Sequence, residues 1–255
     1  MEQGERMPRP DDYAAVYEAL YQRGYHSNLR LTHAEPLLRA IEKEPKLNSS
    51  IHSVLDIGCS HGAAVQRLWR MGKIASGVDV AATAVARAAA ERQADSTHAC
   101  VEACFRQGSA LALPWPPRSF DAVISSDVLE HLAPSHVPRA AAEIRRVARR
   151  WALLSIGSRP ELNSNHLHKL QREAWGNGSA HRASRRRPSD RAQTAPPLPA
   201  TLKDQHHPIM QGLHLSVRPF RWWRQVFERR GFDVRLAVSG ENGWPHTLWL
   251  EVPGK

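Results

Sequence analysis

The nine residues from Val54 to Gly62 constrain the fold of this chain more than any other segment. They read V-L-D-I-G-C-S-H-G, so a short apolar run ends at Asp56 and glycines follow at Gly58 and Gly62. The run predicts a buried strand over 53–57, and the residues after the second glycine predict a helix. Glycine lets a turn approach a ligand closely, and the first N–H groups of a helix favour an anionic group. A strand, a glycine turn and a helix in this order predict a site for a nucleotide-like cofactor.

The spacing of the glycines does not fit the dinucleotide fingerprint. Counting from Gly58, the pattern G-x-G-x-x-G would need glycine at Ser60 and at Ala63. The pattern present is Asp-x-Gly-x-x-x-Gly, formed by Asp56, Gly58 and Gly62. Later segments of the chain must therefore decide which cofactor is bound.

Three later segments follow in a fixed order. Residues Ile74–Val80, I-A-S-G-V-D-V, predict a second strand with Asp79 at its tip, 21 residues after Gly58. A carboxylate at that position can accept hydrogen bonds from both ribose hydroxyls of an adenosine. The segments Gln107–Trp115, Q-G-S-A-L-A-L-P-W, and Ser119–Leu132, S-F-D-A-V-I-S-S-D-V-L-E-H-L, come next.

In this order the motifs resemble the class I S-adenosylmethionine-dependent methyltransferases, in the branch called type 11, over about residues 53–158. The resemblance implies S-adenosylmethionine as the cofactor and methyl transfer as the activity. It also implies an α/β fold, a Rossmann-like, mostly parallel seven-stranded sheet in the order 3-2-1-4-5-7-6. Helices cover both faces of that sheet, and an antiparallel hairpin closes it at the C-terminus.

The resemblance assigns roles to individual residues. The turn would lie under the amino-acid end of the cofactor, Asp56 would meet its ammonium or cap the turn, and Asp79 would bind the ribose. Ser109 stands where many members have aspartate at the adenine edge, and Ser60 where most have glycine. The expected cofactor-binding residues are Asp56, Gly58, Ser60, Gly62, Asp79, Ser109, Ala110 and Ser126.

Catalysis is expected where the fourth strand ends, at Ser126 and Asp127, because open α/β sheets place ligands at the carboxyl ends of their strands. Methyl transfer from a sulfonium depends chiefly on alignment and desolvation. A base is needed only when the acceptor loses a proton, and Asp127, Glu130 and His131 are the local candidates. We expect Asp127 and His131 to serve, although His131 also fits a structural role at the start of a helix.

The alternation of patterns predicts the elements and the division of the chain. Helices are expected at 13–23, 34–43, 63–71, 82–93, 135–149 and from Pro219 to Gly231, and strands at 53–57, 75–80, 101–106, 120–126, 151–156, 232–238 and 247–252. We expect an N-terminal helical cap over 1–50, a cofactor-binding core over 51–158, and a partly disordered insertion over 159–216. Residues 217–255 would complete the same domain with a helix and a hairpin.

The N-terminal cap carries four tyrosines at every fourth position, which are Tyr13, Tyr17, Tyr21 and Tyr25. They form either a face that docks on the core or an aromatic lid over the site, and the two roles are compatible. We expect the acceptor pocket to combine this helix with parts of the insertion, around His166–Trp175 and His206–His214. The acceptor itself is expected to be a small molecule.

The net charge of +10 lies largely in the last third of the chain, where residues 161–255 carry 15 basic and 8 acidic groups. Five arginines fall between Arg182 and Arg191, without interleaved aromatics that would stack on bases. This run is either a solvated segment, the reading we favour, or a weak binder of polyanions. An RNA methyltransferase, or a non-catalytic binding or assembly protein with this fold, are the alternative functions.

Cysteine, histidine and hydropathy patterns set further expectations. Three cysteines do not make a disulfide framework, which indicates a reducing compartment and a cytoplasmic protein. No run of 18 apolar residues occurs, so no membrane span is expected. Five of the histidines in or near the expected insertion match no zinc template and join no cysteine, so no metal site is expected. They are His166, His168, His206, His207 and His214.

Overall fold

A computed structural model describes residues 9–23, 34–92, 100, 103–157, 214–238 and 246–254. The expected insertion falls almost wholly on 158–213, so its ordering, its basic run Arg182–Arg191 and five of its histidines lie outside the described residues. Tyr25 and the turn between the last two strands lie outside them as well.

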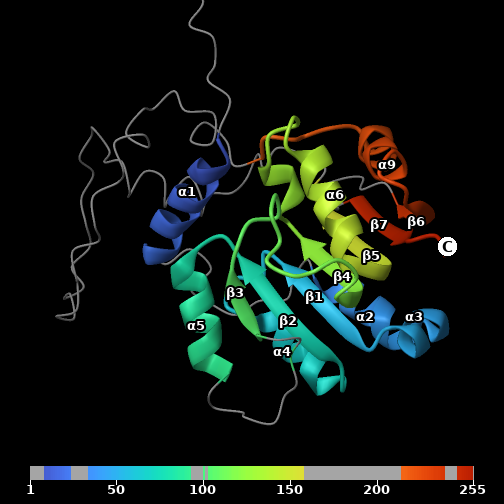
Figure 1. The fold of residues 1–255 in the computed structure, drawn as a ribbon, viewed down its shortest axis with the longest axis horizontal. Coiled ribbons are helices and arrows are strands. Elements are labelled where there is room, and N and C mark those ends of the chain that lie inside the picture. The colour runs from blue at the N-terminus through green and yellow to red at the C-terminus, as the bar shows by residue number, and fades with distance from the viewer. Residues whose placement is uncertain are drawn as a thin grey trace, which may run out of the picture.

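The protein is built on one seven-stranded sheet (Figure 1). The strands β1 to β5 pair in parallel, and β7 pairs antiparallel with both β5 and β6. This confirms the predicted order 3-2-1-4-5-7-6 and the C-terminal hairpin. The strands across the sheet are β3 (Phe105–Gln107), β2 (Ile74–Asp79), β1 (Ser53–Ile57), β4 (Phe120–Ser126), β5 (Ala148–Ile156), β7 (His246–Glu251) and β6 (Asp233–Val238).

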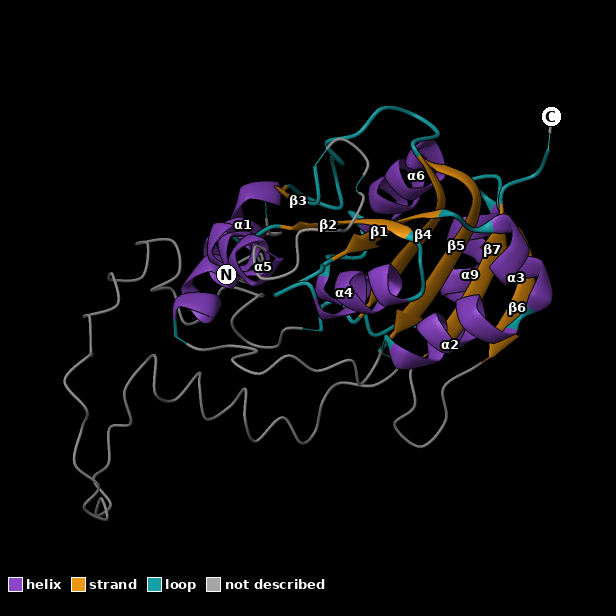
Figure 2. Ribbon diagram, turned by 90° about the horizontal axis from the view of Figure 1, so that it is seen from below, coloured by secondary structure: helices purple, strands orange, loops and turns teal. Residues whose placement is uncertain are grey.

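Helices cover both faces of the sheet, as Figure 2 shows from below. One face packs on α2 (Glu35–Lys43), α3 (Pro45–Ser50) and α4 (Ala63–Arg70), and the other on α6 (Val137–Val147) and α9 (Phe220–Glu228). Side chains alternate between the two faces along a strand, so Val54 packs on the face covered by α2, α3 and α4, and Leu55 on the face covered by α6 and α9. None of the described helices is long and apolar enough to cross a membrane.

Two more helices, α1 (Pro10–Gln22) and α5 (Ala82–Arg92), contact each other at the β3 end of the sheet (Figure 1). The short helix η1 (Leu129–His131) follows β4. Because β1, β2 and β4 run parallel, the turns after them meet at one edge of the sheet. Helix α1 reaches this edge, and its contacts there are described with the site.

The predicted elements are present with shifted bounds, and one helix was missed. No helix was expected between 43 and 53, but Pro45 starts α3 there. Glu44, which precedes it, is forced into an extended conformation with ψ of 114°, and proline suits the first position of a helix. Strand β3 occupies 105–107 rather than 101–106, and β5 begins at Ala148, directly after α6.

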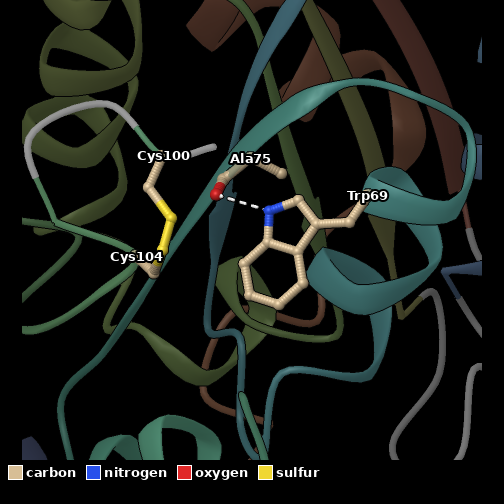
Figure 3. The surroundings of a disulfide bond; sticks show 4 residues. All are labelled: Trp69, Ala75, Cys100 and Cys104. Carbon is tan, nitrogen blue, oxygen red and sulfur yellow. Dashed lines mark hydrogen bonds between the residues drawn. A yellow bond between two sulfur atoms is a disulfide. The ribbon is translucent and has the colours of Figure 1, made fainter. Parts of the chain in front are cut away.

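Cysteine pairing differs from the sequence-based expectation. The structure joins Cys100 to Cys104 by a disulfide beside the start of β3 (Figure 3). The same region packs on α4, where the Trp69 indole N–H donates to the Ala75 carbonyl at 3.1 Å. Cys59 is free and buried, as expected for a cysteine that packs as a small apolar group.

Candidate functional site

The turn after β1 has the unusual backbone that its glycines predicted. Three of its residues have left-handed dihedrals, with φ of +75° at Gly58, +49° at Ser60 and +83° at Gly62. A Cβ at Gly58 would lie 2.2 Å from Cγ2 of Val128, which follows β4, so only glycine fits there. Ser60 takes the conformation that glycine would favour, at a cost of about 1–2 kcal/mol. A strained residue at a strand end is a feature of binding sites.

Asp79 holds this turn in place. Its Oδ2 accepts a hydrogen bond from the Ser60 N–H at 2.9 Å, and its Oδ1 accepts one from the Ala81 N–H at 3.0 Å. The Tyr21 hydroxyl, on α1, also hydrogen-bonds to this carboxylate. A carboxylate offers about four acceptor positions, and the Ser60, Ala81 and Val80 N–H groups and the Tyr21 hydroxyl already donate to this one, so a ribose hydroxyl would have to replace one of these donors. The sequence analysis assigned Asp79 to the ribose and missed its part in shaping the turn.

A second buried carboxylate, Asp56, lies close enough to Asp79 for their charges to repel. Burial, reinforced by the charge of Asp79, raises the pKa of Asp56 from 3.8 to about 8. Burial also raises the pKa of Asp79, against the lowering effect of its hydrogen bonds. Two carboxylates in a dry site favour a positively charged ligand, because a nearby cation stabilises their ionised forms. S-adenosylmethionine, with its sulfonium and ammonium groups, has this charge.

The loop after β3 lies against the same edge. The Gly108 N–H donates to the Asp79 carbonyl at 2.9 Å. The Ser109 hydroxyl accepts from the Leu111 N–H at 3.1 Å, so it stabilises its own turn. The structure thus places Ser109 and Ala110 directly after Gly108, which contacts the end of β2 at Asp79, and their contact with adenine stays a prediction.

The end of β4 forms the other side of the site. Asp127 has a left-handed φ of +54°, and its N–H donates to the Ser155 carbonyl of β5 at 3.1 Å. Ser126 pairs with Ser155 in the sheet. Four residues on, His131 is buried and faces the Tyr17 ring edge-on, with centroids 6.0 Å apart. The expected catalytic residues therefore lie on the strand and turn that face α1, and their roles stay predictions.

Helix α1 both docks on the core and covers the site. The Tyr13 hydroxyl accepts from the Ala133 N–H at 2.8 Å and lies 2.9 Å from His136 Nδ1. Two turns later, Tyr21 packs on His61 of the glycine turn at 5.4 Å between ring centroids. The docking of the tyrosine stripe on the core is confirmed, and its role as a lid over a bound ligand stays a prediction.

Sequence reasoning missed His61, although it lies inside the glycine motif. The side chain is 3% exposed, and its Nδ1 has no hydrogen-bond partner among the described residues. Burial, aided by Arg87, lowers the pKa of this imidazole, which favours its neutral form. No periodicity or spacing singles out this residue, because its neighbour Tyr21 lies 40 residues earlier in the chain.

Comparison with known proteins follows the geometry. Residues 55–156 match the family model described as a methyltransferase domain. A sequence comparison with curated proteins found no match. Among solved structures, the chain is similar to a putative Haloferax volcanii methyltransferase in complex with the Trm112 methyltransferase activator, with a TM-score of 0.59 and 14% identity over 97% of this chain and 100% of that one.

Two further structures share the fold. The magnesium protoporphyrin IX methyltransferase ChlM from Synechocystis PCC 6803, with bound SAH, has a TM-score of 0.53 and 14% identity, covering 98% of this chain and 90% of that one. The PH0226 protein from Pyrococcus horikoshii OT3 has a TM-score of 0.57 and 18% identity, over 90% and 91%.

The sheet order and the glycine turn define a Rossmann-like methyltransferase. Residues 55–156 match the type 11 methyltransferase domain, and this match supports an enzyme that uses S-adenosylmethionine as its cofactor. When bound, S-adenosylmethionine supplies an electrophilic methyl group on its sulfonium. The protein's own part is to neutralise the positive charge of the cofactor, orient the reactants and exclude water from them. The buried acids and the left-handed turn are suited to this.

Proposed function

We propose that this enzyme methylates a small molecule held between α1 and the ends of β4 and β5. The observation that carries the proposal is the contact of Tyr17 with His131, since it closes the reacting edge with a helix from the other end of the chain. His131 is 8% exposed and packs on His214 as well, with ring centroids 4.6 Å apart. A covered edge suits a small acceptor better than a long polymer.

In this proposal two tyrosines of α1 contact different parts of the site. Tyr21 contacts the cofactor side of the site through Asp79, and Tyr17, one turn earlier, contacts the acceptor side through His131. The nucleophilic atom of the acceptor attacks the methyl carbon in line with the breaking S–C bond. If that atom carries a proton, Asp127 or His131 accepts it.

Calorimetry tests cofactor binding first. We expect S-adenosylmethionine and S-adenosylhomocysteine to bind with one site per chain, and no heat at millimolar ligand would refute the function. The acceptor is then sought by incubating the enzyme and S-adenosylmethionine with metabolite fractions. Mass spectrometry would follow products that gain about 14 mass units, the change from H to CH₃.

A point substitution separates acceptor binding from cofactor binding. Helix α1 contributes Tyr13, Val16 and Leu20 to the core, so deleting it would disturb the fold. We expect Tyr17→Ala to raise the KM for the acceptor at least about tenfold, as expected for loss of a partly buried aromatic contact. Its affinity for S-adenosylhomocysteine should stay within about twofold of wild type. If Tyr17→Ala weakened acceptor binding and S-adenosylhomocysteine binding equally, the proposal that Tyr17 serves the acceptor side alone would be contradicted.

Deleting part of the insertion tests whether the substrate is a nucleic acid. We expect deletion of residues 179–199, which carries the arginine run, to leave cofactor affinity and turnover nearly unchanged. An RNA methyltransferase would instead lose RNA affinity on deletion, and its binding would fall steeply with salt. RNA methylation that depends on this segment would overturn the small-molecule proposal.

A further inference from the structure

Three side chains that can ligate a metal meet beside the acceptor edge. They are Glu130 and His131 of η1 and His214 of the segment before α9, and their ligand atoms all lie within 4.8 Å of one another. Glu130 is fully buried, and His131 nearly so. The sequence analysis expected no metal because it looked for ligand spacing along the chain. Here 83 residues separate His131 from His214.

Hydrogen bonds tie the two segments together. The Ser216 N–H donates to the Glu130 carbonyl at 2.8 Å, and the Ser216 hydroxyl donates to the Leu132 carbonyl at 2.6 Å. These bonds hold the segment that carries His214 against the turn that carries the other two groups. The approach of His214 is therefore fixed by backbone contacts on both sides of η1.

The carboxylate has its own support from β5. The Gly157 N–H, at the end of that strand, donates to Glu130 Oε1. A Cβ at Gly157 would lie 2.6 Å from this oxygen and 3.1 Å from Cε1 of His214, so the position must be glycine for the three groups to converge. Metal sites commonly hold a ligating carboxylate by a hydrogen bond of this kind.

We propose that Glu130, His131 and His214 bind a divalent transition-metal ion, with Zn²⁺ as the best match. Two imidazoles and one carboxylate form a ligand set that zinc favours, with a fourth position open for water or another ligand. Around a tetrahedral zinc with bonds of about 2.0–2.1 Å, ligand atoms lie about 3.3 Å apart. Side-chain rotations that draw the three groups together by up to about 1.5 Å, the difference from the observed limit, complete the site.

A buried carboxylate is costly unless it is paired or bound to a metal. Here the neighbours are two imidazoles, which ligate a metal in their neutral form. A metal-bound His131 is not available as a base, so Asp127 alone would then accept the proton in the proposed reaction. The competing interpretation is a hydrogen-bonded trio without a metal, and the two differ in whether the protein takes up zinc.

Zinc titration of the chelator-treated full-length protein tests the proposal. Calorimetry would give stoichiometry and affinity, and Co²⁺ absorption would report the coordination geometry. The ligand variants are Glu130→Gln, which keeps an oxygen for the Gly157 N–H, and both His214→Ala and His214→Gln. The matched control is His52→Ala, since His52 is an exposed histidine distant in sequence from the cluster. Circular dichroism and thermal unfolding would establish that each variant is folded.

We expect one zinc per chain in wild type and an affinity loss of more than about tenfold in each ligand variant. Removing even an outer-shell partner of a metal ligand costs about 10–100-fold. The His52→Ala variant should match wild type. No zinc uptake by wild type, or equal affinity and equal Co²⁺ spectra in wild type and the His214 variants, would overturn the site. S-adenosylhomocysteine binding, measured on the same samples, tests the proposed function separately.

Discussion

The buried pair Asp56 and Asp79 leads us to predict that replacing one acid stabilises the protein, which is the opposite of the usual effect of replacing a buried polar residue. Asp56→Asn should stabilise the cofactor-free protein near neutral pH. The pKa of Asp56 rises from 3.8 to about 8 on folding, chiefly because burial disfavours its charged form. The folded state therefore holds a proton that the unfolded state has released, and stability falls as pH rises between these two values.

The size of the effect follows from the same two numbers. At pH 7 the Asp56 carboxyl is ionised in the unfolded state. In the folded state it must either ionise while buried or stay protonated above its usual pKa, and this lowers the free energy of unfolding by about 4 kcal/mol at most. Asparagine has nearly the same shape and carries no charge, so the variant avoids this cost. The gain in the free energy of unfolding should approach zero near pH 4 and reach a plateau above about pH 8.

Urea unfolding of both proteins between pH 4.5 and 8.5 measures the gain directly. Asp121→Asn is the matched control with the opposite sign. Asp121 accepts hydrogen bonds from the His52 and Ser53 N–H groups, and its contacts with Ser53 and Arg149 lower its pKa despite desolvation. That variant should lose stability at neutral pH, with a deficit that shrinks as pH falls. If Asp56→Asn is destabilised at pH 7, or its difference from wild type does not grow with pH, the account of the acid pair is wrong.

Three other substitutions test the turn and its neighbours. Gly58→Ala places a Cβ 2.2 Å from Val128 and should destabilise the fold by more than about 2 kcal/mol. The control Gly72→Ala has a similar φ of +74° but nothing within 4 Å of the new Cβ, so it should cost only about 1 kcal/mol. Equal losses of stability in thermal unfolding would argue against the clash. Asp79→Ala should weaken S-adenosylhomocysteine binding at least tenfold. It should also destabilise the turn by about 2–6 kcal/mol, because the Ser60 and Ala81 N–H groups lose their acceptor. Unchanged affinity in calorimetry would show that Asp79 does not bind the cofactor. Tyr21→Phe should further raise the pKa of Asp79, since a lowering hydrogen bond is lost, and shift the pH dependence of cofactor affinity upward; a superimposable pH profile would contradict this.

The sequence alone determined the core of the fold. The run into Asp56, the acid at Asp79 and the alternation of apolar segments predict the strands, because periodicity and glycine spacing are local properties of the chain. Their order, which the structure confirms, was implied by the resemblance to the methyltransferase family. The spacing of Trp223 and Phe227 also indicates one apolar face of a helix, and both side chains are fully buried in the structure. These local patterns do not predict α3, which depends on how Glu44 and Pro45 bend the backbone.

Only the tertiary structure decided which distant side chains meet at the site. It brings Tyr21 to Asp79, Tyr17 to His131, and His214 to Glu130, each across 58 or more residues of sequence. No spacing rule covers such pairs, since the sheet order and the docking of α1 set their distances. The raised pKa of Asp56 has the same origin, because burial and a neighbouring charge exist only once the strands have paired.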